Sequence, residues 1–288
     1  MRKIMLATDF SDRSDRALRR AVLMAKEIGA GLVILHVVDD DRPRRIVERD
    51  RGDAEALLHE LAATVRSVDG VACEARVMLA DPFAGILQAV DEGQPDLLVI
   101  GSHRRRVLRD VFVGTTAERT IRSVTTPVLM VNAPPVGPYR HILQTTDLSE
   151  GSRESLRCMG QLPLGAHVVR TVLHVYAAPA LRLAMAHSLS DEDREDYLHH
   201  ERAAALKALA ELMAACEARD AAAIVRHDGT TVASEILTAS SELKADLIVV
   251  STRAKTSLAR MFLGSVAEQV LRTSPVDVLA VPAGSRPS

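Results

Sequence analysis

Short apolar runs alternate with longer stretches in which apolar residues recur every three or four positions along the chain. The runs have the length and the Val, Ile and Leu content of strands, whereas the longer stretches have the spacing of amphipathic helices. In the first half the pattern predicts strands at 3–8, 32–38, 71–78, 97–100 and 128–131. It predicts helices after Ser14 and over 54–65, 82–90 and 116–124.

The pattern returns in the second half, which indicates a tandem duplication. Asp9 corresponds to Asp147, 138 positions later, whereas Glu118 corresponds to Glu268 at an offset of 150. The 12 additional residues fall in the helical region 181–219, where a long helix is expected over 191–219. Strands are expected at 142–146, 168–175, 223–227, 247–250 and 278–281.

Strands that alternate with helices indicate right-handed βαβ units and parallel sheets covered on both faces. We therefore expect two tandem α/β domains, 1–133 and 139–283, each with a doubly wound, five-stranded, mostly parallel sheet of the Rossmann-like class. The Pro/Gly-rich segment 134–138 is expected to be a short linker.

Composition and charge exclude several classes of protein. Lys plus Arg number 36 and Asp plus Glu 38, and this net charge of -2 argues against binding nucleic acid through a basic surface. No apolar run is long enough to span a bilayer and the N-terminus does not resemble a signal peptide, so no membrane association is expected. Cys73, Cys158 and Cys216 are widely spaced and form no CxxC pair, which favours a cytoplasmic location.

Candidate binding residues stand at the predicted strand ends and helix starts. Ligands of open parallel sheets bind beyond the carboxyl ends of the strands, where helix N-termini attract anions. An aspartate there can accept a hydrogen bond from a ribose hydroxyl. In the first half this rule selects Thr8, Asp9, Val38, Gly101, Gly114 and Thr115. In the second half it selects Asp147, Ser251, Gly264 and Ser265.

A structural interpretation of the same residues remains open. Asp9 and Asp147 can serve as turn residues, and Thr115 and Ser265 can cap helices without contacting a ligand. The matching histidines of the second strands, His36 and His174, are expected to be hydrogen-bonded inside the fold.

Four motifs together carry a specific resemblance. The first strand of each half ends in Thr-Asp-Phe-Ser or Thr-Asp-Leu-Ser, and the second contains Leu-His-Val. Asp-Leu-Leu-Val-Ile-Gly-Ser-His occupies 96–103. Gly-Thr-Thr-Ala-Glu-Arg-Thr-Ile-Arg and Gly-Ser-Val-Ala-Glu-Gln-Val-Leu-Arg precede the last strands. Over 2–131 and 139–282 the chain resembles a tandem universal stress protein, with two UspA-type domains.

The resemblance implies a cytoplasmic stress-response and signalling module with a fold like that of the adenine-nucleotide α-hydrolases. Family members dimerise through their last strands, so 128–131 and 278–281 are expected to meet as an internal pseudo-dimer with a pseudo-two-fold axis. Whether two chains form a further homodimer, and which proteins are partners, stays open.

Nucleotide-binding members of that family carry Gly, two residues, Gly, nine residues and then Gly-Ser/Thr. The pattern falls on Gly101, Arg104, Gly114 and Thr115 in the first half, and on Ser251, Ala254, Gly264 and Ser265 in the second. The first half retains more of the glycines, so the resemblance implies that ATP or a related adenine nucleotide binds there.

The resemblance also implies roles for individual residues. Asp9, next to Thr8, would contact ribose or adenine, and the backbone of Val38 would read the adenine edge. The phosphates would lie against Gly101, Gly114, Thr115 and Thr116. Arg104 and the two arginines that follow it would either neutralise phosphates or pair with nearby acidic residues.

Two other classes of function are weighed against nucleotide binding. One is a nucleotide-free interaction scaffold, as in family members that lack the glycine pattern. The other is an enzyme, but the sequence contains no P-loop, dinucleotide fingerprint, catalytic triad or metal-ligand spacing. No catalytic or metal-binding residue is therefore assigned, and slow ATP hydrolysis is the most that is expected.

Overall fold

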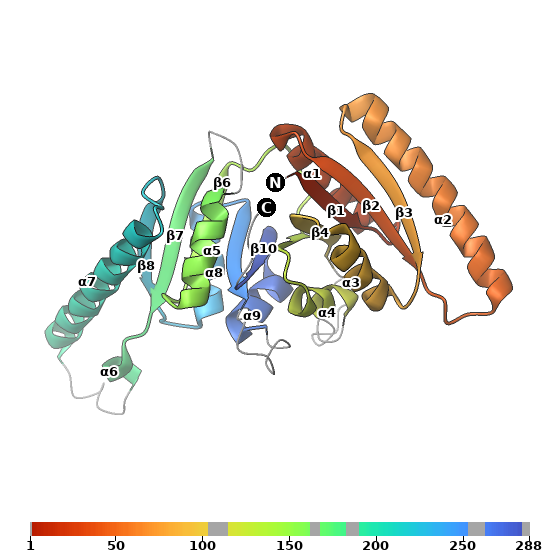
Figure 1. Cartoon of the computed structure of the whole chain (residues 1–288). Helices are drawn as coiled ribbons and strands as arrows, with labels where there is room; N and C mark the ends of the chain where they lie inside the picture. Colours follow the sequence, from red (N-terminus) through yellow and green to blue (C-terminus); the bar gives the residue numbers. More distant parts are fainter. Residues whose placement is uncertain (1, 103–114, 162–167, 183–189, 253–262, 284–288) are drawn as a thin grey trace.

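The computed structural model describes residues 2–102, 115–161, 168–182, 190–252 and 263–283. Within these residues ten strands form one sheet, with helices on both of its faces (Figure 1). The strand order is β3-β2-β1-β4-β5-β10-β9-β6-β7-β8.

The elements of the two halves follow each other in the same order. The strands of the first half are β1 (Lys3–Ala7), β2 (Gly31–Val38), β3 (Cys73–Leu79), β4 (Leu97–Gly101) and β5 (Val128–Val131). Its helices are α1 (Asp12–Ile28), α2 (Arg44–Thr64, extended by a π-helical turn at Val65–Asp69), α3 (Pro82–Gly93) and α4 (Thr116–Ser123). The strands of the second half are β6 (His141–Thr146), β7 (Val169–Tyr176), β8 (Ala222–His227), β9 (Leu247–Thr252) and β10 (Asp277–Pro282). Its helices are α5 (Glu150–Gln161), α6 (Pro179–Arg182), α7 (Asp191–Ala215), α8 (Val232–Glu242) and α9 (Ser265–Thr273).

The two halves join edge to edge. All strand pairs within each half are parallel, as expected for doubly wound sheets. At the junction β5 pairs with β10 in antiparallel orientation, with Leu129 opposite Leu279. The two expected five-stranded sheets are therefore fused into one, and the mirrored strand order gives the pseudo-two-fold relation. The predicted contact between the last strands is confirmed.

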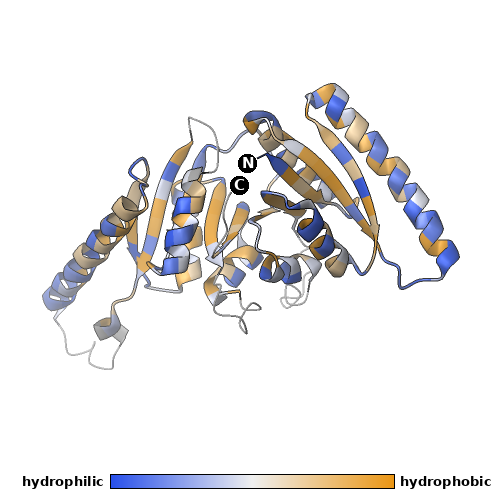
Figure 2. Cartoon of the chain, viewed as in Figure 1, coloured by the Kyte–Doolittle hydropathy of each residue, from blue (hydrophilic) through white to orange (hydrophobic). Residues whose placement is uncertain are grey.

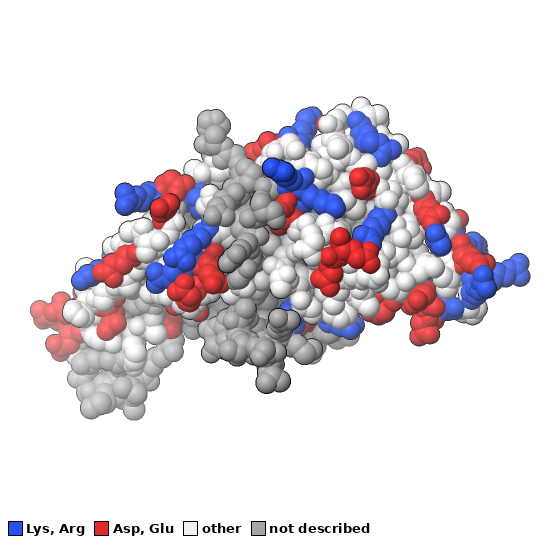
Figure 3. Space-filling model, in the orientation of Figure 1, with Lys and Arg blue, Asp and Glu red and all other residues white. Residues whose placement is uncertain are grey.

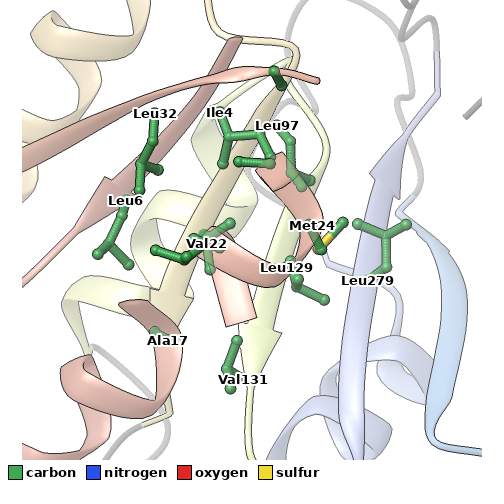
Figure 4. Close-up of a cluster of buried hydrophobic side chains, with 14 of the residues drawn as sticks. Ile4, Leu6, Ala17, Val22, Met24, Leu32, Leu97, Leu129, Val131 and Leu279 are labelled. Carbon is green, nitrogen blue, oxygen red and sulfur yellow. The ribbon is translucent and has the colours of Figure 1, made fainter. Parts of the chain in front are cut away.

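An apolar layer on each face holds the helices against the sheet. On one face Met24 of α1 lies beside Leu129 of β5 and Leu279 of β10, so this layer crosses the junction between the halves (Figure 4). On the other face α3, α4, α8 and α9 cover the strands. The middle strands are hydrophobic along their length, whereas in the outer strand β3 hydrophobic residues alternate with hydrophilic ones (Figure 2). Strands buried on both faces require this apolar composition.

The predicted and observed helix boundaries differ most at the start of α2 and at the end of α7. The helix predicted over 54–65 begins ten residues earlier, at Arg44. The prediction missed its first turns because they face solvent and carry charged rather than periodic apolar residues. Ion pairs four residues apart, such as Arg44–Glu48, support this exposed segment. The helix predicted over 191–219 ends at Ala215. The additional residues of the second half add no strand to the part of the chain that is described, although 183–189 lie outside it.

A buried polar cluster ties the two halves to the segment that connects them. The Oδ2 atom of Asp277, at the start of β10, accepts hydrogen bonds from Arg20 Nε (3.1 Å) and from the Tyr139 hydroxyl (2.7 Å). Its Oδ1 atom accepts from the backbone N–H groups of Asn132 (2.9 Å) and Ala133 (3.1 Å). Burial and the neighbouring Asp277 carboxylate raise the pKa of Tyr139, so its hydroxyl keeps the proton that it donates.

Candidate functional site

A cavity opens where the strand order of the first half changes direction, between β1 and β4. Ligands of doubly wound sheets bind at this point, because the helices that follow the two strands lie on opposite faces and leave a crevice between their N-termini. The volume is about 460 Å³, within the roughly 300–1,000 Å³ of small-molecule sites. We call it the first-half cavity. Its lining includes Thr8, Asp9, Ser11, Arg13, Ser14, Val37, Ile86, Ile100, Gly101, Thr115, Thr116 and Thr120.

The turn after β1 fixes the position of Asp9. Phe10 has a φ of 58°, a left-handed conformation that a bulky residue adopts only under strain, and its N–H donates to Thr8 Oγ1 at 3.1 Å. Asp9 Oδ1 accepts hydrogen bonds from the Ser11 N–H (3.0 Å), the Ser11 hydroxyl (2.5 Å) and the Ser14 hydroxyl (2.5 Å). Because these donors occupy Oδ1, the Oδ2 atom is the one left to a ligand.

Asp9 carries its negative charge at neutral pH. Burial raises the pKa of this carboxyl, but hydrogen bonds from Ser11 and Ser14 and the charge of Arg13 outweigh burial and hold the pKa below its ordinary value. The Arg13 guanidinium lies 3.7 Å from Asp9 Oδ2. A carboxylate and a cation therefore share one wall of the cavity.

The N-terminus of α4 forms the opposite wall. The Thr115 hydroxyl accepts a hydrogen bond from the Glu118 N–H (3.1 Å) and caps the helix, as the structural interpretation of this residue predicted. One turn further along, Thr120 is buried and also lines the cavity, yet its hydroxyl has no hydrogen-bond partner within the described part of the chain. Backbone N–H groups at a helix start and an unpartnered hydroxyl are both suited to a polar ligand.

Gly101 marks a close approach between β4 and α1. A Cβ atom at this position would lie 3.0 Å from the backbone C and O atoms of Arg13 and 3.1 Å from the Ser14 N atom. Any side chain here would push the first turn of α1 outward. The absence of a side chain at Gly101 therefore lets the first turn of α1 pack closely against β4 at the base of the crevice.

The second-strand histidines are half-buried and line the cavities, so they are not purely interior residues. His36 Nδ1 lies 2.8 Å from the Thr8 carbonyl, and His174 Nδ1 lies 2.9 Å from the Thr146 carbonyl. Since a carbonyl only accepts, Nδ1 carries the proton in both rings. Each ring thus anchors the end of the first strand in its half.

The second half repeats the aspartate turn around a smaller cavity of about 360 Å³, which we call the second-half cavity. Asp147 Oδ1 accepts from the Ser149 N–H (3.0 Å) and the Ser152 hydroxyl (2.6 Å), and Leu148 has a φ of 62°. The hydroxyl of Ser251, which replaces Gly101, lies 3.2 Å from the Ser152 hydroxyl. Ser251 thus places a side chain at the base of the crevice, where the first half has none.

Other replacements make the described wall of the second-half cavity less polar. Its lining contains Val266 where the first half has Thr116, and Val270 replaces Thr120 in the helix. Gly151 stands at the position of Arg13 and provides no side chain.

The structure brings together most of the residues selected from the sequence. Thr8, Asp9, Gly101, Thr115 and Thr116 line the first-half cavity, and Asp147, Ser251, Gly264 and Ser265 line the second-half cavity. Ser265 begins α9 and Gly264 occupies the N-cap position, so the expectation that Ser265 caps this helix was wrong.

One selected residue among those described, Val38, does not join the cavity wall. Val38 packs with Val47 and Ala54, and its carbonyl accepts from the Ala80 N–H (3.1 Å), whereas its neighbour Val37 lines the cavity. Side chains alternate between the faces of a strand, and this separates the two valines. Arg104 and Gly114 lie outside the described residues.

Several lining residues were not selected from the sequence. Ser14 recurs as Ser152 at the offset of 138, a repeat that could have identified it. Arg13 and Thr120 leave no such signal, because Gly151 and Val270 replace them in the second half.

Other surface features add no further site. Among the described residues, no group of His, Cys, Asp and Glu side chains is arranged to hold a metal ion, and no helix is long and apolar enough to cross a membrane. Acidic and basic side chains are interspersed on the face seen in Figure 3.

Comparison with known proteins identifies the same family in both halves. The model of the universal stress protein family matches residues 1–132 and 138–282. Universal stress protein E of Salmonella typhi is 25% identical over 299 residues, which cover 96% of this chain and 93% of that protein. A universal stress protein of Mycolicibacterium smegmatis is 33% identical over 133 residues, 44% of this chain and 45% of that protein.

A solved structure shares the whole two-half fold. The crystal structure of a universal stress protein from Archaeoglobus fulgidus aligns with a TM-score of 0.72 over 98% of both chains, at 20% sequence identity. At this identity the likeness extends to the fold.

Proposed function

Because the chain belongs to the universal stress protein family, we propose that it is a stress-response module that binds ATP or a related adenine nucleotide in the first-half cavity and signals through the bound state. The observation that carries this proposal is the set of groups around one cavity: the Asp9 carboxylate, the Arg13 guanidinium and the N-terminus of α4. The three groups match the ribose and phosphate parts of a nucleotide.

Each part of the nucleotide has a suitable wall. Asp9 Oδ2 accepts a ribose hydroxyl while Oδ1 stays bound to Ser11 and Ser14. The apolar side chains of Val37, Ile86 and Ile100 suit the faces of the base, and Thr115 with Thr116 faces the phosphates.

The roles of Val38, Arg104 and Gly114 remain part of the proposal on the strength of the sequence pattern. The second half binds more weakly in this account. Asp147, Gly264 and Ser265 retain part of the site, but Ser251 adds a side chain at the base of the crevice and valine replaces threonine in the wall.

A nucleotide-free interaction scaffold is the second candidate function, and the second-half cavity is the observation that favours it. In that cavity Ser251 stands at the position of Gly101, and its hydroxyl shares a hydrogen bond with the Ser152 hydroxyl. A half of this kind would serve as a rigid support for the other half or for a protein partner.

We also propose that the protein works in the cytoplasm. Its three cysteines are free and buried, which suits a compartment that keeps thiols reduced. Burial raises the pKa of Cys73 and of Cys158 to about 11, so both stay protonated and unreactive at neutral pH.

Thermal unfolding with and without ATP tests the proposal through a matched pair of variants. A ligand that binds only the folded state at about a hundred times its Kd stabilises that state by about 2.7 kcal/mol, which raises the Tm of the wild type clearly. Asp9→Asn keeps an oxygen for Ser11 and Ser14 but replaces the ribose acceptor by a donor, so the Tm increase should be lost. Asp147→Asn makes the same change in the equivalent turn and should retain most of it.

Two outcomes would decide against this account. If ATP, ADP, AMP and cyclic AMP all leave the wild-type Tm unchanged, and mass spectrometry of the denatured protein finds no nucleotide, the scaffold function stands instead. If both variants lose the Tm increase equally, nucleotide binding is not confined to the first-half cavity.

A further inference from the structure

Arg13 presents its guanidinium to the first-half cavity, and few contacts with the described residues draw it away from there. It lies in the first turn of α1, lines the cavity, and has a side chain that is only 28% exposed. Its one ionic neighbour in the described part of the chain is Asp9 Oδ2, at 3.7 Å, beyond hydrogen-bond distance. The guanidinium has five N–H donors in a planar fork, and this single long contact within the described residues leaves those donors available to a ligand.

The stability of α1 does not explain a cation at this position. The positive end of a helix dipole lies at the N-terminus, so an arginine in the first turn is unfavourable there. The Ser11 side chain accepts from the Ser14 N–H and caps the helix, and Asp12 with Asp15 supplies the acidic residues that favour a helix start. Arg13 opposes all of these local preferences.

The two halves differ at this point in a reciprocal way. The first half combines a side chain on the helix, Arg13, with no side chain on the strand, Gly101. The second half combines Gly151 on the helix with Ser251 on the strand. Because a Cβ atom on Gly101 would lie only 3.0 Å from the Arg13 backbone, the strand glycine allows the residue that carries the guanidinium to approach the crevice.

We propose that Arg13 binds the phosphate groups of the ligand and makes the first-half cavity selective for phosphorylated over unphosphorylated nucleosides, an inference that rests on the proposed function. The planar fork of arginine matches two oxygens of a phosphate at once, and such charge-assisted hydrogen bonds are stronger than neutral ones. On ligand binding, the guanidinium exchanges a long contact with Asp9 Oδ2 for short contacts with phosphate. The hydrogen bonds that Ser11 and Ser14 donate to Asp9 are unaffected, so the aspartate turn stays in place.

Calorimetric titration of three ligands into the full chain tests this role. ATP, AMP and adenosine share the base and ribose, and only the first two carry phosphate. For Arg13→Ala, the Kd for ATP and AMP should rise by about tenfold or more, while the Kd for adenosine should stay within about twofold of the wild type. Arg19→Ala removes a charge from the same helix at an exposed position that does not line the cavity, and it should leave all three Kd values unchanged.

Three results would overturn the assignment. Equal ATP affinity of the wild type and Arg13→Ala would show that the guanidinium does not contact phosphate. An equal loss for adenosine would show that Arg13 acts through Asp9 or the fold. Arg13→Gln, which keeps a long side chain, must reproduce the alanine result, and wild-type ATP affinity in this variant would contradict the proposal. If the wild type bound none of the three ligands, the proposed function itself would fail, whereas the results above leave it standing.

Discussion

Asp9 and Asp147 lie in the same turn, built twice in one chain. In both halves a non-glycine residue with positive φ follows the aspartate, and serine side chains occupy its Oδ1 atom. The repeated motif predicted both turns, because each of these residues has a counterpart in the other half. The residues that distinguish the cavities, Arg13 and Thr120, have no counterpart, and a repeat therefore gives no means of finding them.

The buried hydroxyl of Thr120 is expected to lower the stability of the folded protein without ligand. Two other helical threonines satisfy their hydroxyls locally: Thr64 Oγ1 donates to the Glu60 carbonyl at 3.0 Å, and Thr273 Oγ1 donates to the Gln269 carbonyl at 2.7 Å. The buried Thr120 hydroxyl has no such bond, and an unsatisfied buried group costs about 1–3 kcal/mol. Thr120→Val, which copies the buried Val270 of the second half, should raise the free energy of unfolding by about 1 kcal/mol without ligand.

Urea unfolding measures this effect, with Thr64→Val as a control that should give no gain because it removes a satisfied and exposed hydroxyl. A less stable Thr120→Val variant would mean that the hydroxyl has a partner in the folded protein, such as an ordered water.

At the scale of elements, apolar patterning predicted the buried strands and most helices, but not the full length of α2. Its first turns from Arg44 are charged and solvent-facing, so no apolar period marks them. The sequence likewise did not point to the Asp277 cluster. That cluster joins Arg20, Tyr139 and Asp277, which are far apart in the chain and have no repeated spacing.

The buried Asp277 cluster should contribute far more to the free energy of unfolding than the exposed Arg44–Glu48 ion pair, although the N–O distance is shorter in the exposed pair. Asp277→Ala would leave the buried Arg20 guanidinium without its counter-charge, and breaking a buried pair in this way destabilises by about 3–5 kcal/mol. Arg44→Ala removes the 2.7 Å pair with Glu48, in which the Arg44 side chain is 92% exposed. That change should alter stability by less than about 1 kcal/mol.

Chemical denaturation of both variants provides the comparison. Similar free energies of unfolding for Asp277→Ala and Arg44→Ala would show that burial of the cluster does not stabilise the junction between the halves.

At the scale of the whole molecule, duplication predicted the architecture better than it predicted the site. The doubled motifs indicated two similar halves, and the contact of β5 with β10 follows from the way the family pairs its last strands. Function in this account depends on how the halves have diverged. A crevice with Gly101 at its base and a guanidinium on its wall stands in one half, and Ser251 places a side chain at the base of the crevice in the other.

The stoichiometry of ATP binding tests this division of the two halves most directly. Calorimetric titration of ATP into the full chain at low micromolar protein should give close to one nucleotide per chain, with Asp9→Asn abolishing binding and Asp147→Asn leaving both stoichiometry and Kd near those of the wild type. Two equivalent sites per chain, or binding that survives Asp9→Asn and disappears with Asp147→Asn, would contradict the assignment of the nucleotide to the first-half cavity.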